Sequence, residues 1–351
     1  MITAGSVSIE IVVLSGFCYL YINYHLQKWG LLPFVMDRRE FLTRVWQTVA
    51  VAAMVGEAGL FNSGCQTEGY LKTKTPKPDF EVAVDPKIPK VVLARNEDFA
   101  EALRSALDNI GGIERFIKKG ERVLLKPNVA WNRVPEQAAN TNPILVGEMT
   151  RQCKIAGASD IFVTDYGTQN PRQTFARSGI KKAVEHNGGR ILYLDDDDFV
   201  EDDLKGKFIT TWPVLKHIFE VDRLINMPIA KHHGMVSGTA SMKNFFGAIG
   251  GNRGRLHEQI DQAIVDLAAY FRPTLTVIDA TRVLIRNGPA GGSFDDVVIC
   301  NSVICATDQV AADSRACEFL GKSGPEIGHV VLAAQQGLGK IDYRKAGYKE
   351  L

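Results

Sequence analysis

The stretch Arg223–His257, RLINMPIAKHHGMVSGTASMKNFFGAIGGNRGRLH, predicts a buried strand, then a basic loop, then a helix. Its apolar beginning, Leu224–Ile229, has the continuous hydrophobicity of a strand that is buried on both faces. Lys231 and two adjacent histidines follow this strand directly, and Lys243 and a Gly-rich turn come later. In open parallel sheets, ligands bind in the crevice beyond the carboxyl ends of the strands. The stretch therefore predicts both the kind of sheet and the position of a ligand site.

Strand and helix patterns alternate on both sides of this stretch. Predicted strands are Lys90–Leu93, Arg122–Leu125, Asp160–Val163, Arg190–Leu194, Arg223–Met227, Leu275–Ile278 and Val297–Val303. Predicted helices are Asp98–Ile110, Pro143–Ala156, Pro171–His186, Glu258–Phe271, Gln309–Leu320 and Pro325–Gln336. Such alternation predicts an α/β fold with a mostly parallel sheet flanked by helices. Residues 90–351 are near the upper limit for one core, which leaves room for a second, smaller lobe.

Composition narrows the classes of partner. The chain has 351 residues and a net charge of +1, so it lacks the excess of positive charge on which bulk nucleic-acid binding depends. No nucleic-acid partner is expected, and the local cluster of basic residues predicts a small anionic ligand instead. The six cysteines include no Cys-x-x-Cys pair, so no iron–sulfur cluster is expected.

The sequence of the first 89 residues predicts a targeting segment followed by a linker. The pair Arg38 and Arg39, followed by Glu-Phe-Leu and an apolar stretch, has the layout of a twin-arginine export signal over residues 36–65. Residues 1–35 then lie upstream of the expected initiator, Met36, and residues 66–89 form a linker to the α/β domain at 90–351. We expect a periplasmic or membrane-anchored protein.

Two alternatives remain for this region. The apolar segment 7–24 contains Glu10 and has only the marginal length for a bilayer span, and a membrane anchor formed by it is one alternative. Cys65 ends an Asn-Ser-Gly-Cys sequence, which resembles a lipoprotein cleavage box except for Asn62 in the place of an aliphatic residue. Lipid attachment at Cys65 is therefore an open alternative.

Polar residues at the predicted strand ends form a candidate ligand site. Lys126 and Asn128 flank Pro127, which stops the sheet ladder at the end of a strand. The residues predicted to bind an anionic ligand are Lys126, Asn128, Lys231, Asn244 and Arg253. A Gly-rich loop before a helix can add backbone N–H groups to such a site.

Histidines and carboxylates suit either acid–base work or a divalent metal. We predict catalytic roles for His233, Lys243 and His257. As metal ligands we consider His232, His257, Asp165 and Asp279, although two adjacent histidines on a strand point to opposite faces. For the two aspartates, helix or turn capping is the alternative to metal binding.

Several motifs, in order, resemble the family called domain of unknown function 362. They are Leu125–Asn128, Thr141–Pro143, Thr164–Gly167, Lys231–His232, Met242–Gly247, the helix after His257, Val277–Ala280, Asn287–Pro289 and Thr307–Asp313. The resemblance covers about residues 90–340. Many members carry a ferredoxin-like module with two four-iron clusters, whose cysteines this chain lacks. The family also often has His where this chain has Asn142.

The order of His233, Ser237, Gly238 and Lys243, followed by His257, also resembles, more distantly, the nickel-dependent lactate racemase family. That resemblance implies that Lys243 would carry a nickel-containing nucleotide, His257 would bind nickel and His233 would transfer protons. Three hypotheses follow for function: an enzyme acting on a small anion, with or without a divalent metal; a clusterless binding or redox-partner protein of a membrane-associated complex; and a racemase-like nickel enzyme.

Overall fold

A computed structural model describes residues 70–351, which form one compact unit. The twin-arginine motif, the segment 7–24 and Cys65 lie outside the described residues. Among residues 70–351, no helix combines the length and the apolar character that a membrane span needs.

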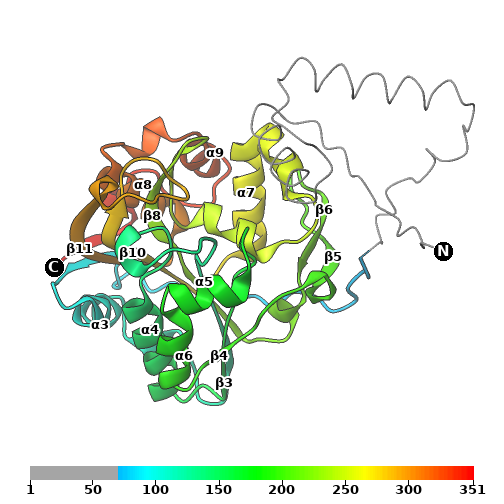
Figure 1. The fold of residues 1–351 in the computed structure, drawn as a ribbon, viewed down its shortest axis with the longest axis horizontal. Helices are drawn as coiled ribbons and strands as arrows, with labels where there is room; N and C mark the ends of the chain where they lie inside the picture. The colour runs from blue at the N-terminus through cyan, green and yellow to red at the C-terminus, as the bar shows by residue number, and fades with distance from the viewer. Residues whose placement is uncertain (1–69) are drawn as a thin grey trace, which may run out of the picture. The chain divides into compact units, whose positions relative to one another are not determined.

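One large sheet runs through this unit, with strand order β12-β1-β11-β10-β7-β2-β3-β4 (Figure 1). Its strands are β1 (Val91–Arg95), β2 (Arg122–Pro127), β3 (Asp160–Val163), β4 (Arg190–Ile191), β7 (Arg223–Met227), β10 (Leu275–Leu284), β11 (Val297–Ala306) and β12 (Tyr348–Glu350). Two short strands lie off this path: β8 (Ile229–His233) pairs with β10, and β9 (Ser237–Thr239) pairs with β8. The neighbours of β2, β3, β4 and β7 are all parallel, whereas β11 is antiparallel to both β1 and β10. The predicted α/β class and mostly parallel sheet are confirmed.

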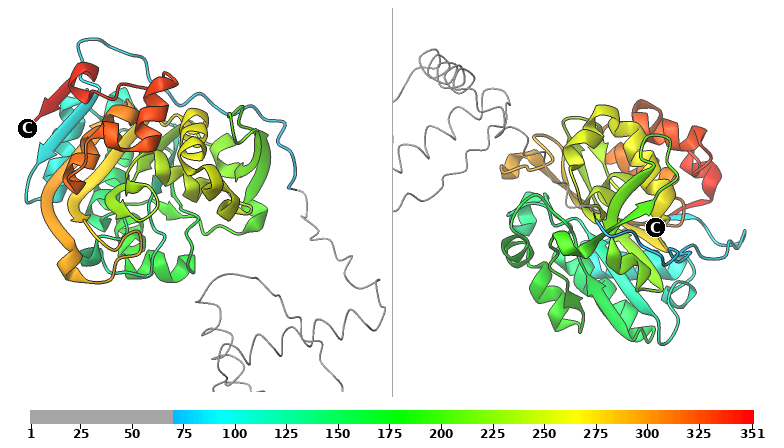
Figure 2. Two further views of the ribbon diagram at one scale, coloured as in Figure 1. Left: turned by 90° about the horizontal axis from the view of Figure 1, so that it is seen from above. Right: turned by 90° about the vertical axis from the view of Figure 1, so that its right-hand side faces the viewer.

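Helices cover both faces of the sheet (Figures 1 and 2). They are α3 (Phe99–Asn109), α4 (Pro143–Ile155), α5 (Pro171–Arg177), α6 (Ile180–His186), α7 (Ile260–Phe271), α8 (Gln309–Cys317) and α9 (Gly328–Gln335). Within β2, Val123 and Leu125 pack in the cluster that contains α3 and α4, whereas Leu124 packs in the cluster that contains α7. This alternation follows from the period of two in a strand and explains why β2 is apolar throughout.

Two predicted elements differ in length from those observed. The expected helix Pro171–His186 is two helices, α5 and α6, because Gly179 between them adopts a left-handed conformation with φ of 76°. The expected helix from Glu258 begins at Ile260, and a 3₁₀ segment, η6 (Arg253–Gln259), precedes it. Local hydrophobic periodicity does not resolve either boundary.

The second, smaller lobe for which the sequence left room does not form a separate unit within residues 70–351. A two-stranded antiparallel sheet, β5 (Phe199–Asp203) with β6 (Thr211–Leu215), does stand apart from the large sheet. Its residues Phe199, Val214 and Leu215 nevertheless pack in the same core cluster as α7.

The described part of the expected linker packs on the domain. Phe80 is completely buried, and Thr73 N–H donates a hydrogen bond to the Glu201 carbonyl of β5. Residues 70–89 therefore contribute to the core, although they contain no regular helix.

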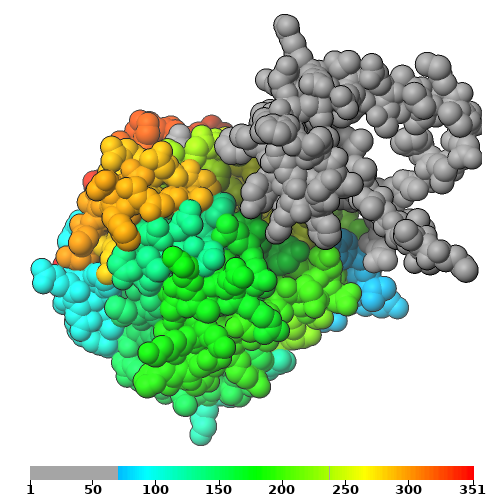
Figure 3. All heavy atoms as spheres, viewed as in Figure 1, coloured from blue at the N-terminus to red at the C-terminus, as the bar shows by residue number. Residues whose placement is uncertain are grey.

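The loop between β10 and β11 adjoins the segment around Gln137 on one face of the molecule (Figure 3). Gln137 Nε2 donates a hydrogen bond of 2.8 Å to the Gly292 carbonyl. This contact holds the loop that carries Gly288 and Pro289 beside the carboxyl end of the sheet, where both residues line a cavity.

Candidate functional site

The site begins where three neighbouring parallel strands end. In the register of the sheet, Lys126 of β2 lies opposite Asn226 of β7, and Leu125 lies opposite Val163 of β3. Thr164 and Asp165 follow β3 directly. Because these strands are parallel, their polar ends meet at one edge of the sheet.

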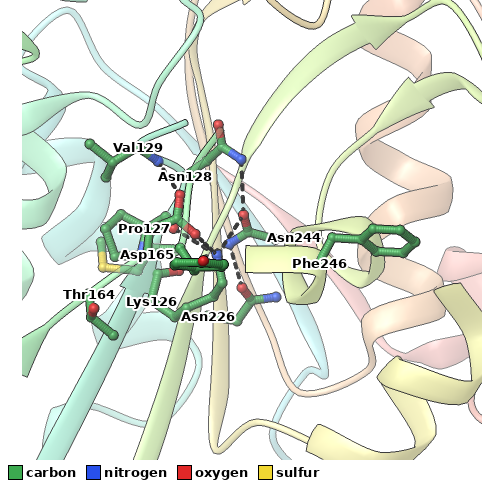
Figure 4. A network of polar contacts seen from close by, with 12 residues as sticks. Lys126, Pro127, Asn128, Val129, Thr164, Asp165, Asn226, Asn244 and Phe246 are labelled. Carbon is green, nitrogen blue, oxygen red and sulfur yellow. Dashed lines mark hydrogen bonds and ion pairs between the residues drawn. The ribbon is translucent and has the colours of Figure 1, made fainter. Parts of the chain in front are cut away.

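Lys126 and Asp165 form a buried ion pair at this edge (Figure 4). Lys126 Nζ lies 2.5 Å from Asp165 Oδ1 and also donates to the Pro127 carbonyl at 3.0 Å. Asp165 Oδ2 accepts a hydrogen bond of 2.6 Å from Val129 N–H. Burial lowers the pKa of Lys126, and the Asp165 carboxylate opposes that shift. The two charges therefore compensate each other.

Three asparagine side chains connect this pair to the 3₁₀ segment η5 (Met242–Ala248) (Figure 4). Asn244 Oδ1 accepts hydrogen bonds of 3.2 Å from both Lys126 Nζ and Asn128 Nδ2. Asn244 Nδ2 donates to Asn226 Oδ1 at 2.8 Å and to the Lys126 carbonyl at 3.0 Å. Every polar atom of the buried Asn244 amide thus has a partner, which fixes η5 on the strand ends.

A cavity of about 620 Å³ opens above this network. That volume is in the range of sites for small organic molecules. Its lining includes the cationic side chains Lys231, Lys243 and Arg253 and two histidines, His233 and His257. Asp165, which already pairs with Lys126, is the sole carboxylate residue among the described residues that line it. The cavity is therefore electrostatically suited to an anion.

Lys231 lies almost completely buried at the wall of this cavity. Its Nζ donates to Asn128 Oδ1 at 3.0 Å and to the Ala139 carbonyl at 2.6 Å, both of them neutral acceptors. Burial lowers the pKa of Lys231 to about 7, with Lys126 contributing and Asp165 opposing the shift. A bound anion would supply the negative counter-charge that the protonated Lys231 side chain lacks.

Lys243 differs from the other two lysines in its hydrogen bonding. Its Nζ has no hydrogen-bond acceptor among the described residues and lies 3.3 Å from the centroid of the Phe246 ring. Burial, together with the positive charges of Arg253 and Lys231, lowers the pKa of Lys243 to about 7. Close to neutral pH, a large share of this amine is therefore unprotonated.

The two histidines that line the cavity differ in the hydrogen bonds of their rings. His233 Nδ1 accepts a hydrogen bond of 3.3 Å from Met235 N–H, so the neutral ring carries its proton on Nε2. Burial and the nearby Lys243 lower the pKa of His233 to about 4, which keeps the ring neutral. His257 Nδ1 lies 3.2 Å from the Gly254 carbonyl, a pure acceptor, so this nitrogen is the donor and Nε2 has a free lone pair in the neutral ring.

Arg253 has a structural function in addition to its charge. Its guanidinium donates to the carbonyls of Tyr166 at 2.6 Å, Phe246 at 3.0 Å and Gly167 at 3.2 Å. These contacts join the loop after β3 to the end of η5, so Arg253 holds one wall of the cavity in place.

The four residues predicted as metal ligands do not converge. Among residues 70–351, no group of three or more His, Cys, Asp or Glu side chains is placed to hold a metal ion. Asp165 is paired with Lys126, and His232 Nδ1 accepts a hydrogen bond of 3.2 Å from Gly288 N–H. Successive residues of a strand face opposite sides, which separates His232 from the cavity that His233 and His257 line.

Asp279 of β10 is also engaged in structure. Its carboxylate accepts hydrogen bonds from Asn142 N–H at 2.8 Å, from Thr281 N–H at 2.9 Å and from Thr281 Oγ1 at 2.7 Å. Asn142 caps α4 by accepting from Ile144 N–H at 3.0 Å. The cap of α4 is therefore Asn142, and Asp279 holds Asn142 and Thr281 by hydrogen bonds from within β10.

Asn226 and Trp131 are among the residues of the site that were not predicted. Asn226 lies in a segment with the pattern of an apolar strand, and Trp131 lines the cavity from a loop. A polar residue inside an otherwise apolar strand was the available signal for Asn226, because a buried amide needs partners. No local pattern marks Trp131. Gly247, which belongs to the predicted Gly-rich loop, lies over the ion pair.

The family model for a domain of unknown function (DUF362) matches residues 123–318, which include every strand that ends at the site. The chain belongs to the DUF362 family. The predicted family is thereby confirmed, whereas the twin-arginine export expected of this member remains a prediction.

One relative of this DUF362 protein is the Thylakoid-associated protein sll1697 of Synechocystis sp., which is 27% identical over 252 residues. The match covers 68% of this chain and 74% of the relative. Among solved structures, the lactate racemase apoprotein from Thermoanaerobacterium thermosaccharolyticum aligns with a TM-score of 0.43 at 14% identity. A protein from Thermotoga maritima aligns with a TM-score of 0.38 at 10% identity. These alignments cover 70% and 69% of this chain but only 61% and 60% of the respective structures.

Proposed function

We propose that this DUF362 protein binds a small organic anion in the cavity beyond β2, β3 and β7 and acts on it as an enzyme. The observation that carries the proposal is the charge balance of the cavity. Lys231, Lys243 and Arg253 line it, and the carboxylate among the described lining residues is neutralised by Lys126. An anion that enters this cavity therefore meets Arg253 and two lysines that have no carboxylate partner when they are protonated.

The ionisable groups favour catalysis over passive binding. Burial brings the pKa of Lys231 and of Lys243 to about 7, where an amine can both take up and release a proton at neutral pH. His233 is held neutral, and the His257 ring leaves one nitrogen free. Groups with strongly shifted pKa values that share one cavity are typical of active sites.

Anion binding can be tested by calorimetric titration of the full chain with pyruvate, oxalate and inorganic phosphate. Trp131 lines the cavity, so its fluorescence gives a second readout. We expect saturable binding of at least one organic anion, weakened about tenfold in Lys231→Met, which corresponds to about 1.4 kcal/mol. The exposed Lys207→Met is the matched control. Absence of saturable binding, or equal affinities in the two variants, would contradict the proposal.

A second candidate is a binding protein that works beside a membrane, without its own cluster. The name of the cyanobacterial relative, a thylakoid-associated protein, favours it. It predicts that the native protein sediments with membranes and that this depends on residues 1–69. A protein that stays in the soluble fraction while turning over an organic anion would favour the enzyme.

A further inference from the structure

The three lysines around the cavity are held in different ways. Lys126 donates to Asp165, and Lys231 donates to Asn128 and Ala139. In the part of the chain that the structure describes, no acceptor meets Lys243 Nζ, although this residue lines the cavity. An amine that is neither paired nor hydrogen-bonded keeps its lone pair available.

The surroundings of Lys243 favour the unprotonated amine. Arg253 and Lys231 are cationic neighbours, and burial removes water from Nζ. The face of the Phe246 ring, 3.3 Å from Nζ, attracts the ammonium form and opposes these two influences. Desolvation and like charge are the two influences that turn a lysine into a nucleophile toward carbonyl carbon. Lys243 experiences both.

The same neighbours would hold the other end of a ligand. Lys231 and Arg253 can bind a carboxylate, and aromatic side chains of Trp131, Tyr166 and Phe246 line the cavity beside them. The cavity thus combines an amine, a site for negative charge and apolar surface. A carboxylate that carries a neighbouring carbonyl group matches this combination.

We propose that Lys243 forms a Schiff base with the carbonyl carbon of a small 2-oxo acid whose carboxylate is held by Lys231 and Arg253. This inference rests on the anion site proposed above and specifies its substrate class. It assigns Lys243 a role as nucleophile, not only as a positive charge.

The step balances without a redox partner. The neutral Nζ attacks the carbonyl carbon, a C–N bond forms, and the carbonyl oxygen takes up a proton to give a carbinolamine. Loss of the hydroxyl group with a second proton releases one water, and a C=N bond remains. Nζ loses its two protons in forming the neutral imine and regains one in the iminium form. His233 and His257, which line the cavity, are placed to move these protons.

Borohydride trapping tests this proposal. The full chain is incubated with pyruvate or phenylpyruvate and sodium borohydride, and the reduced adduct is located by peptide mass spectrometry. Lactate, which has the carboxylate but no carbonyl, is the ligand control. Lys243→Arg and Lys243→Met remove the amine, and the exposed Lys207→Met is the protein control. Melting temperatures show whether each variant is folded.

We expect one adduct per chain, on Lys243, formed with either 2-oxo acid but not with lactate. The amount of this adduct should be at least tenfold lower in folded Lys243→Arg or Lys243→Met and the same in Lys207→Met. An adduct on Lys231, or no adduct in a protein that binds pyruvate by calorimetry, would overturn the Schiff base while the anion site stands. Lys243 already carrying a covalent group in natively purified protein would also overturn it. A protein that binds no anion would instead refute the proposed function.

Discussion

Lys126 Nζ and Asp165 Oδ1 lie 2.5 Å apart with side chains that are 1% and 2% exposed. The pair joins the ends of β2 and β3 beneath the cavity. Its two charges cancel, so the positive character of the cavity comes from Lys231, Lys243 and Arg253. The arrangement separates a structural lysine from the lysines available to a ligand.

Replacing Asp165 by Asn should strongly destabilise the fold. The substitution leaves the buried Lys126 ammonium without a counter-charge, which typically costs about 3–5 kcal/mol. Urea unfolding of the full chain measures the change. Asp160→Asn is the control, because Asp160 of β3 pairs with Arg190 at the surface and such pairs contribute about 0–1 kcal/mol. Similar losses in both variants would contradict a special function of the buried pair.

Gly247→Ala should disrupt the site. A Cβ atom at this position would lie 2.7 Å from Lys126 Nζ and even closer to Asp165 Oδ1, so η5 would have to move away from the strand ends. We expect a loss of about 1–3 kcal/mol in the free energy of unfolding, as for other overpacking substitutions, together with weaker anion binding. Gly234→Ala is the comparison, because a Cβ there meets no atom within 4 Å. If both variants bind and unfold alike, close packing at Gly247 is not essential.

The reactivity of Lys243 should rise as the pH passes through about 7. Its pKa is lowered to about 7, so the unprotonated amine accumulates above this pH instead of above the ordinary lysine value of 10.5. Competitive labelling with trace acetic anhydride, followed by peptide mass spectrometry, measures this profile, with Lys207 in the same digest as reference. A Lys243 midpoint close to 10.5 would show that its amine is well solvated.

Anion affinity should change with pH in the opposite direction. Lys231 and Lys243 are protonated below about 7 and lose their charge above it, so binding weakens as the pH rises through this range. Because a bound anion favours the charged amines, binding near pH 7 should also take up protons. Calorimetry in two buffers with different ionisation enthalpies detects that uptake. Affinity that is constant from pH 6 to 9 would argue against the lysines as the anion-binding groups.

Residues 36–89, fused to a reporter that must fold before export, should carry it out of the cytoplasm. The expectation rests on Arg38 and Arg39 and the apolar stretch after them. Changing both arginines to lysine should abolish export, as measured by reporter activity in the periplasmic fraction. Export that persists in the double variant would eliminate the twin-arginine signal.

Hydrophobic periodicity alone was enough to identify the α/β fold and most of its central strands. Strands buried on both faces, such as β2 and β7, leave an unbroken apolar run in the sequence, and their order along the chain predicts where polar residues gather. Lys126, Asn128, Lys231, Asn244 and the other residues predicted to bind or react with a ligand do lie at this edge. Short strands such as β8 and β9 carry no such run and went unpredicted.

Only the tertiary structure determined which charged side chains form pairs. Asp165 and Lys126 are 39 positions apart, and they pair because β2 and β3 are neighbours in the sheet. This ion pair engages Asp165, which had been predicted as a metal ligand. His232 and His233 are adjacent in sequence, yet only His233 lines the cavity. The free amine of Lys243 likewise depends on which acceptors the fold brings within reach. Sequence patterns report local periodicity and burial, whereas charge pairing and pKa depend on distances between segments that are remote along the chain.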